Sequence, residues 1–255
     1  MNAKRAIGQE VHFTKYRKYG PYHWSAFSLD FRHRDLFTLA RYRLILDCAQ
    51  IQGPCSIVDM GCGDGALTFL AWQQNRNGVT IGIEPDEVGR QLAAEMLGKR
   101  RAGVQLLSTS VPVASASQDY VLCADVIEHV PDDEGFLREI KRILKPGGRV
   151  ALSTPVRITK EVRDPEHCRE YYPDEFCQLV GKQFEVRMQR FCSPVCALEL
   201  YQWHPRMFRG RPIFGWVMSA LSISTGKNLL YCSNASCSYW LTQAIVGIKS
   251  DSFPR

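Results

Sequence analysis

The residues best suited to ligand chemistry form a short glycine-rich run that begins with a carboxylate. Asp59 is followed by Gly61, Cys62 and Gly63, between an apolar stretch and a segment with helical character. Glycines at such a turn let the backbone approach a ligand closely, and the helix that follows adds N–H groups and the positive end of its dipole. The run therefore predicts a ligand that lies directly on the turn.

A second carboxylate, Glu84, ends the next apolar stretch, 23 residues after Gly61. A carboxylate at this place can accept hydrogen bonds from both hydroxyls of a ribose. Together the two features predict a nucleoside cofactor. A nicotinamide dinucleotide and S-adenosylmethionine (AdoMet) satisfy them equally well.

Two histidines follow later apolar runs and are candidates for proton transfer. His129 comes after the run 119–124, and His167 lies in the polar segment 164–173. Imidazole is the usual general base near neutral pH. Structural roles are also open: His129 could cap a turn before a helix, and His167 could stand on the surface before another.

These residues require an alternation of strands and helices to bring them together. Buried-strand patterns at 56–60, 79–84, 104–107, 119–124 and 149–153 alternate with helical patterns at 66–74, 87–97 and 134–144. Further on, 173–181 reads as a helix, 184–191 as a strand and 238–249 as a last strand. Such alternation predicts an α/β fold whose parallel sheet has helices on both faces.

Four blocks in order resemble the class I AdoMet-dependent methyltransferases, especially the small-molecule, sugar and lipid group (type 11). They are Ile57–Gly65, Gly82–Asp86, Asp119–Asp132 and Phe136–Arg149. The resemblance covers residues 55–154. It implies a Rossmann-like, doubly wound, mostly parallel seven-stranded sheet with an antiparallel last strand, and AdoMet rather than a nicotinamide cofactor.

The resemblance also implies roles for the matched positions. The methionine end of AdoMet would be lined by Asp59, Gly61, Cys62 and Gly63. The ribose would be held by Glu84, with Pro85 and Asp86 near the adenine. The end of the fourth strand, with Asp125 and Val126, would lie beside the cofactor, and Glu128 and His129 would face the transferred methyl group.

Composition sets wider limits. In 255 residues there are 32 Lys and Arg against 26 Asp and Glu, so the net charge of +6 permits an anionic partner without requiring one. The first ten residues lack the apolar core of a signal peptide, and we expect a cytoplasmic protein. The ten cysteines are scattered, and the late pairs Cys192/Cys196 and Cys232/Cys237 have no matching histidines, so we expect no metal site.

The remaining segments flank the core of a single domain. We expect an irregular aromatic arm and a helix in residues 1–50, with the helix 33–50 amphipathic, the AdoMet-binding core in 51–193, an insertion in 194–228 and a closing strand in 229–255. The arm is either a lid over the site or a packed tail. The insertion contains three arginines beside apolar residues in 204–224, which predicts either peripheral contact with an anionic membrane or a helix packed on the core.

The expected reaction is O-methylation of a sugar, lipid or lipid-linked metabolite. The segment 125–128 does not match the motif of base-amine methyltransferases, yet RNA stays open as an acceptor. A nicotinamide-dependent reductase and a non-catalytic AdoMet-binding protein are two further functions that these motifs allow.

Overall fold

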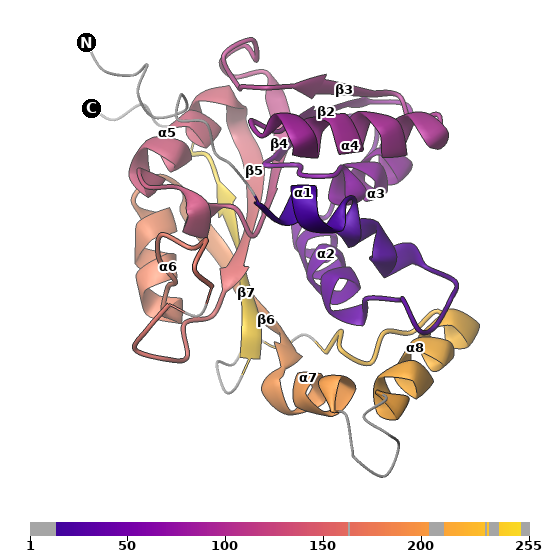
Figure 1. The fold of residues 1–255 in the computed structure, drawn as a ribbon. Coiled ribbons are helices and arrows are strands. Elements are labelled where there is room, and N and C mark those ends of the chain that lie inside the picture. The colour runs from indigo at the N-terminus through magenta and orange to yellow at the C-terminus, as the bar shows by residue number, and fades with distance from the viewer. Residues whose placement is uncertain (1–13, 163, 204–211, 233, 235–239, 251–255) are drawn as a thin grey trace.

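The structure, a computed structural model, describes residues 14–162, 164–203, 212–232, 234 and 240–250 (Figure 1). Its strands are β1 Ser56–Met60, β2 Val79–Ile83, β3 Val104–Leu107, β4 Gln118–Ala124, β5 Leu144–Pro155, β6 Glu185–Pro194 and β7 Trp240–Ile248. Its helices are α1 Thr14–Tyr19, α2 Leu36–Ala49, α3 Ala66–Gln74, α4 Glu87–Lys99, α5 Asp133–Ile143, α6 Pro173–Gly181, α7 Val195–Gln202 and α8 Ile213–Thr225. Short 3-10 helices span Tyr22–Phe27 (η1) and Ile127–His129 (η2).

All seven strands belong to one sheet, in the order β3-β2-β1-β4-β5-β7-β6. Strands β1 to β5 are parallel, and β7 runs antiparallel between β5 and β6. The predicted Rossmann-like, doubly wound sheet with an antiparallel last strand is therefore confirmed. The strand order changes direction between β1 and β4, which is where ligands bind in such sheets.

Helices cover both faces of the sheet (Figure 1). One core joins α5 and α6 to the sheet and the other joins α2, α3 and α4 to it. Successive strand residues serve opposite faces, as Ile57 and Val58 do in β1 and Val121 and Leu122 do in β4. Because both faces are covered, the strands read as nearly continuous apolar runs.

The central elements lie close to their predicted bounds. Helices α3 and α6 and strands β1 and β3 match residue for residue, and most other ends shift by one or two residues. Strand β5 is the exception, because it starts at Leu144, directly after α5 ends at Ile143. Residues 145–148 continue the strand, so Pro146 and the glycines after it stop the helix without making a separate loop.

The N-terminal arm is helical where it is described, so the prediction of an irregular segment was wrong for residues 14–27. The turn of the glycine-rich run fixes η1, because the Asp64 side chain accepts from the His23 N–H at 3.0 Å. The Trp24 indole donates to the Asp64 carbonyl oxygen at 2.8 Å. Residues 1–13 of the expected arm lie outside the described residues.

Helix α2 is buried on more than one face, so the prediction of a single apolar face was also wrong. Leu44 and Ile45 pack in the sheet core, whereas Leu36 and Ala40 pack against Leu230 and the α7–α8 region. The helix lies between the sheet and this second layer. Two-sided burial explains why no continuous polar face runs along its length.

Between β6 and β7 the chain forms α7 and α8, which contact each other. Both fall inside the expected insertion 194–228. None of the helices within the described ranges is long and apolar enough to cross a membrane.

Candidate functional site

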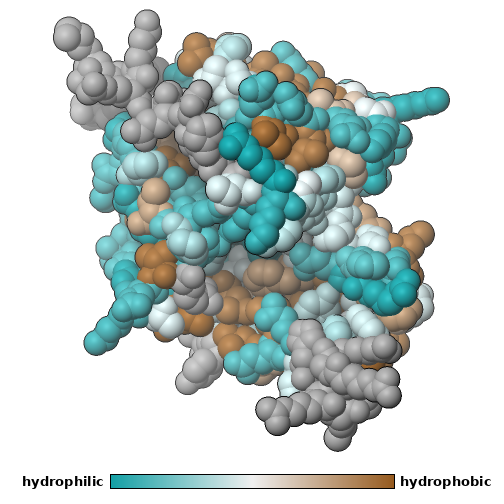
Figure 2. Space-filling view, in the orientation of Figure 1, coloured by the Kyte–Doolittle hydropathy of each residue, from teal (hydrophilic) through white to brown (hydrophobic). Residues whose placement is uncertain are grey.

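A cavity of about 970 Å³ opens at the carboxyl ends of β1 and β4. This volume is at the upper end of the range for small-molecule pockets, so a cofactor and an acceptor fit together. Figure 2 faces its mouth, and brown hydrophobic surface lies below the centre of that view, above α7. Its walls come from α1, η1, α2, the turn after β1, the segment after β4, residues 164–170, α7 and β7.

The glycine-rich turn forms one wall of this cavity, with Asp59, Gly61, Cys62 and Gly63 among the lining residues. Its amides are engaged within the protein. Gly61 and Cys62 donate to the Ile83 carbonyl at 2.8 and 2.9 Å, and Gly63 donates to Glu84 at 2.8 Å. The prediction that the turn offers unused N–H donors to a ligand is therefore wrong for these three amides. A ligand can still approach the backbone closely, because the two glycines have no side chain.

Asp59 lies at the base of the turn and is buried. Its carboxylate accepts a hydrogen bond from the Thr68 hydroxyl at 2.6 Å. Burial raises the pKa of Asp59 to about 7, and the Thr68 hydrogen bond opposes that rise. A buried carboxylate here places negative potential beside the glycine turn, which favours a cationic ligand.

Glu84 is held behind the turn and does not line the cavity. Its two oxygens accept from the Gly63 and Asp86 amides, both at 2.8 Å. Burial raises the pKa of Glu84 to about 7, although the two backbone hydrogen bonds oppose the rise. The carboxylate is thus held beside the glycine turn, where it could accept hydrogen bonds from ribose hydroxyls, but another side chain covers it.

That side chain is Tyr16 of α1. A Cβ added to Gly63 would collide with the Tyr16 hydroxyl, and one added to Gly89 would lie 3.0 Å from the Tyr16 ring. The ring is almost completely buried, and burial raises the pKa of the hydroxyl well above its ordinary value, with the charge of Glu84 adding to the effect. Tyr16 therefore fills the space between Gly63, Glu84 and the start of α4.

Three other predicted cofactor residues lie outside the cavity wall. Asp86 caps α4, because its side chain accepts from the Gly89 amide at 2.8 Å. Pro85 is exposed. Val126 packs directly onto Gly61, where a Cβ would collide with it. Asp86 thus supports α4, and Val126 supports the turn.

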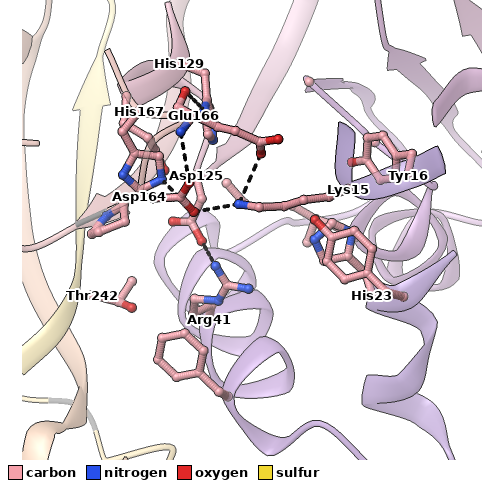
Figure 3. Close-up of a pocket in the computed structure, with 18 of the residues that line it drawn as sticks. Lys15, Tyr16, His23, Arg41, Asp125, His129, Asp164, Glu166, His167 and Thr242 are labelled. Carbon is pink, nitrogen blue, oxygen red and sulfur yellow. Dashed lines mark hydrogen bonds and ion pairs between the residues drawn. The ribbon is translucent and has the colours of Figure 1, made fainter. Parts of the chain in front are cut away.

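Asp125 lines the cavity at the end of β4. Its backbone has a positive φ of 54°, and its amide donates to the Ser153 carbonyl at 3.1 Å, which turns the chain sharply. Its carboxylate accepts from the Ser153 hydroxyl at 2.9 Å and forms an ion pair with Arg41 of α2. Figure 3 shows this pair, which joins α2 to the end of β4.

His129 and His167 come together at the opposite wall, with ring centroids 4.8 Å apart (Figure 3). The Nδ1 atom of His129 lies 2.9 Å from the Glu166 carbonyl, and Nδ1 of His167 lies 3.0 Å from a Glu170 carboxylate oxygen. Burial lowers the pKa of His129, which favours the neutral imidazole. The two predicted catalytic candidates therefore lie side by side on one wall of the cavity.

Glu128 lies between the histidines and the sheet and is completely buried. One oxygen accepts from the Thr154 hydroxyl at 3.0 Å. Burial raises the pKa of this carboxyl well above its ordinary value, and the charge of Asp125 adds to the rise. The Glu128 carbonyl accepts from the amides of Cys168 and Arg169, which ties the segment 164–170 to η2.

Helix α1 is fixed to the same segment by ion pairs. Lys15 contacts Asp164 at 2.6 Å and Glu166 at 3.2 Å, as Figure 3 shows. The Lys15 pairs lie at one end of the cavity and Tyr16 lies at the other. Residues 14–23 of the aromatic arm thus line the site and also pack onto the turn, so the lid and the packed tail both remain predictions.

Sequence reasoning missed Arg41, Tyr16 and Asp64. The one available signal for Arg41 is its place, with Arg43, in the largely apolar stretch 36–46. Tyr16 and Asp64 carry no comparable signal, because their roles depend on how a terminal segment packs onto the turn.

Comparison with known proteins agrees with this geometry. The sequence profile of a family described as "Methyltransferase domain" matches residues 58–152. The ubiquinone biosynthesis O-methyltransferase of Serratia proteamaculans is 34% identical over 113 residues, which are 41% of this chain and 44% of that protein. The chain thus spans less than half the length of the curated relatives it matches.

Two solved structures share the fold. Phosphoethanolamine N-methyltransferase 2 of Haemonchus contortus superposes with a TM-score of 0.63 at 15% identity, over 94% of this chain and 60% of that one. An AdoMet-dependent methyltransferase of Thermotoga maritima gives 0.60 at 19% identity, over 94% and 97%. The family profile thus identifies residues 58–152 as a methyltransferase domain, and the strand order is that of the class I AdoMet-dependent methyltransferase fold.

Proposed function

We propose that the protein transfers the methyl group of AdoMet to a hydroxyl or carboxyl oxygen of a sugar, lipid or lipid-linked metabolite. The observation that carries the proposal is one cavity with two unlike walls. The glycine turn and Asp59 form the first wall, and the histidine pair forms the second. A methyl donor on the first wall and an acceptor on the second would face each other.

Several residues fit the cofactor. The sulfonium would lie near Asp59, with the methionine end along Gly61, Cys62 and Gly63. The Arg41 guanidinium suits the cofactor's carboxylate, because it lines the cavity and no described residue accepts a hydrogen bond from its buried Nε. Glu84 would take the ribose hydroxyls and Asp125 with Val126 would flank the site, with Pro85 and Asp86 nearest the adenine.

Tyr16 has to move for the ribose to reach Glu84. The ring now stands against Gly63 and Gly89. Helix α1 has six residues, and it is held by the buried Tyr16 ring and by ion pairs of Lys15 that are partly exposed. Exposed ion pairs contribute little stability, so the Lys15 pairs resist displacement of α1 only weakly, and cofactor binding has to offset mainly the exposure of the Tyr16 ring.

Methyl transfer is an in-line displacement at the carbon bonded to the sulfonium. The acceptor oxygen forms the new C–O bond while the C–S bond breaks. The electron pair of the C–S bond stays on sulfur, and S-adenosylhomocysteine leaves. Since the leaving group is good, alignment of the reactants carries much of the catalysis, with roughly 7–11 kcal/mol available from it. Two walls that face each other across one cavity suit this task.

A hydroxyl acceptor also has to lose its proton. In the proposal His167 or His129 takes it, which would add roughly 10²–10⁴-fold to the rate. His167 is the better placed, because the Glu170 carboxylate holds Nδ1 and stabilises the imidazolium that forms. A carboxyl acceptor needs no such base. The curated relative's name specifies O-methylation, which supports an oxygen acceptor.

Contact with a membrane is a second part of the proposal. Helix α8 exposes Phe214, Val217 and Leu221, and the end of α7 exposes Leu200 and Trp203. An apolar surface of this kind suits the delivery of a lipid-linked acceptor from an anionic interface. The arginines of 204–211 that favoured this interpretation lie outside the described residues. Flotation with anionic liposomes at low salt, and release at high salt, is the expected result.

The test of the proposed function has two stages. Calorimetric titration with AdoMet and with NADH establishes which cofactor binds. Release of S-adenosylhomocysteine is then followed against fractionated lipid, sugar and small-RNA extracts. Turnover with a lipid or sugar fraction supports the proposal. Turnover with RNA alone would replace it, and binding of AdoMet without turnover on any fraction would leave a non-catalytic binding protein.

A further inference from the structure

One group of side chains at the second wall has the composition of a metal site. Glu128, His129 and His167 each present one ligand atom, and these three atoms lie within 4.8 Å of one another. Three ligands at about 2.0–2.2 Å from one ion lie ~3–3.5 Å apart. Small rotations of the three side chains are enough to close that difference.

Both histidines are oriented as metal ligands usually are. A carbonyl oxygen only accepts hydrogen bonds, so the contact with Glu166 puts the hydrogen of His129 on Nδ1 and the lone pair on Nε2. The Glu170 carboxylate does the same for His167. Hydrogen bonds from Nδ1 to a carbonyl or carboxylate are the outer contacts that orient metal-bound imidazoles.

Glu128 supplies the independent observation. The residue is fully buried, and its Oε1 has no hydrogen-bond partner among the described residues. A buried carboxylate with an unsatisfied oxygen is costly unless a cation or donor reaches it. The same residue lines the cavity, so a ligand in that space can satisfy the oxygen.

The surrounding charge is also favourable. The carboxylates of Asp125, Asp164, Glu166 and Glu170 line the same cavity as Glu128. Lys15 pairs with Asp164 and Glu166, and Arg41 pairs with Asp125. Asp164 also approaches Nε2 of His167 to 3.8 Å, within reach as an additional oxygen ligand.

We propose that Glu128, His129 and His167 bind one divalent transition-metal ion at the acceptor side of the cavity. Two imidazoles and one carboxylate, with the remaining positions open to the cavity, suit Zn²⁺, Mn²⁺ or Co²⁺ better than Ca²⁺, which prefers oxygen ligands. This departs from the expectation, drawn from the cysteine pattern alone, that the chain holds no metal.

The role of the ion rests on the proposed function, although its binding does not. An acceptor hydroxyl on the ion loses its proton to solvent more readily, because the cation stabilises the oxyanion. The oxygen then forms the C–O bond as the C–S bond of the sulfonium breaks. In this arrangement the histidines hold the ion, which replaces an imidazole as the group that activates the hydroxyl.

Metal binding by the untagged protein is the test. The protein is stripped with a chelator and titrated with Zn²⁺, Mn²⁺ and Co²⁺ by calorimetry, and the Co²⁺ form is examined by visible absorption. The expected result is one equivalent of ion and a Co²⁺ spectrum typical of mixed nitrogen and oxygen ligands. Glu170→Gln, a change in a positioning residue, is expected to weaken binding about 10–100-fold, and Glu128→Gln to weaken it further.

The matched control is His33→Gln, because His33 is exposed and lies away from the cavity. It should leave affinity and spectrum unchanged, whereas His167→Gln should abolish both. Circular dichroism and AdoMet titration show whether each variant is folded. No binding by the wild-type protein at millimolar metal, or equal binding by Glu128→Gln, overturns the inference.

Activity separates this inference from the proposed function. If the stripped protein binds AdoMet and turns over at the full rate in chelator, the proposed role of the ion in catalysis is wrong and the methyltransferase proposal stands, while metal binding is decided by the titrations. If the metal binds with the predicted ligand dependence while AdoMet does not, the proposed function fails and the metal site stands.

Discussion

The hydroxyl of Tyr16 lies against Gly63, so closely that a single added methyl group on the glycine would collide with it. Gly63 also donates its amide to Glu84, and the Tyr16 ring covers that carboxylate. The N-terminal helix therefore occupies the place where the family's cofactor would meet the ribose ligand. Cofactor binding and movement of α1 are coupled in this account.

Substitution Gly63→Ala tests the close approach of the cofactor to the backbone at this glycine. Gly63 has a positive φ of 56°, where an alanine costs about 1–2 kcal/mol, and the new Cβ would meet the Tyr16 hydroxyl. We expect a lower melting temperature and at least a tenfold loss of AdoMet affinity. Gly98→Ala in α4 is the control, because nothing lies within 4 Å of its added Cβ. It should raise stability by roughly 0.5–1 kcal/mol and leave affinity unchanged. Wild-type affinity in Gly63→Ala would refute the close approach.

The affinity for AdoMet should depend on pH through Glu84. Its pKa is raised to about 7, mainly by burial, so the carboxyl is protonated below that pH and loses an acceptor and a charge. The dissociation constant should therefore fall as pH rises from 6 to 8, by at most about tenfold per pH unit below the pKa. Calorimetric titration with AdoMet at several pH values between 6 and 8 measures this dissociation constant.

Glu84→Gln is the control for that profile. Asp59 has a pKa of about 7 as well, so the slope that disappears in Glu84→Gln is the part due to Glu84. The variant should bind weakly at every pH, with a flatter profile. A slope identical to that of the wild type would show that Glu84 does not meet the cofactor.

Arg41 should distinguish ligands with and without a carboxylate. The guanidinium lines the cavity and pairs with Asp125. Arg41→Gln is expected to weaken AdoMet binding at least tenfold, because the cofactor's carboxylate loses a charged hydrogen-bond partner. Binding of 5′-methylthioadenosine, which has no carboxylate, should change little. Equal losses for both ligands would assign Arg41 a purely structural role.

Asp64 should hold the arm onto the turn. The residue is fully buried, and its carboxylate accepts from the His23 amide and approaches the His23 ring. Asp64→Asn is expected to cost about 1–3 kcal/mol in urea unfolding, because a buried contact loses its charged acceptor. Asp174→Asn, at an exposed position of α6, should change the free energy of unfolding by less than about 0.5 kcal/mol. Equal unfolding curves for both variants would contradict this role.

The sequence predicted the central fold well because local signals mark it. Glycine, proline and polar residues interrupt apolar runs between 56 and 155, and the strands and helices there follow those interruptions. The same signals located both histidines after strands that end at one edge of the sheet. Their meeting at 4.8 Å follows from the parallel arrangement.

The missed features all depend on contacts between distant segments. No local pattern shows that the Ile83 carbonyl accepts from the amides of Gly61 and Cys62, since the donors lie in the turn after β1 and the acceptor ends β2. The two-sided burial of α2 depends on Leu230 and the α7–α8 region, far along the chain. Tyr16 reaches the turn only because the arm folds back across the sheet edge.

Calorimetric titration of the wild-type protein with AdoMet, beside Glu84→Gln, tests the central claim most directly. The account predicts one bound equivalent for the wild type and a much weaker isotherm for the variant at pH 8. A folded wild-type protein that gives neither heat nor a thermal shift with AdoMet would contradict it.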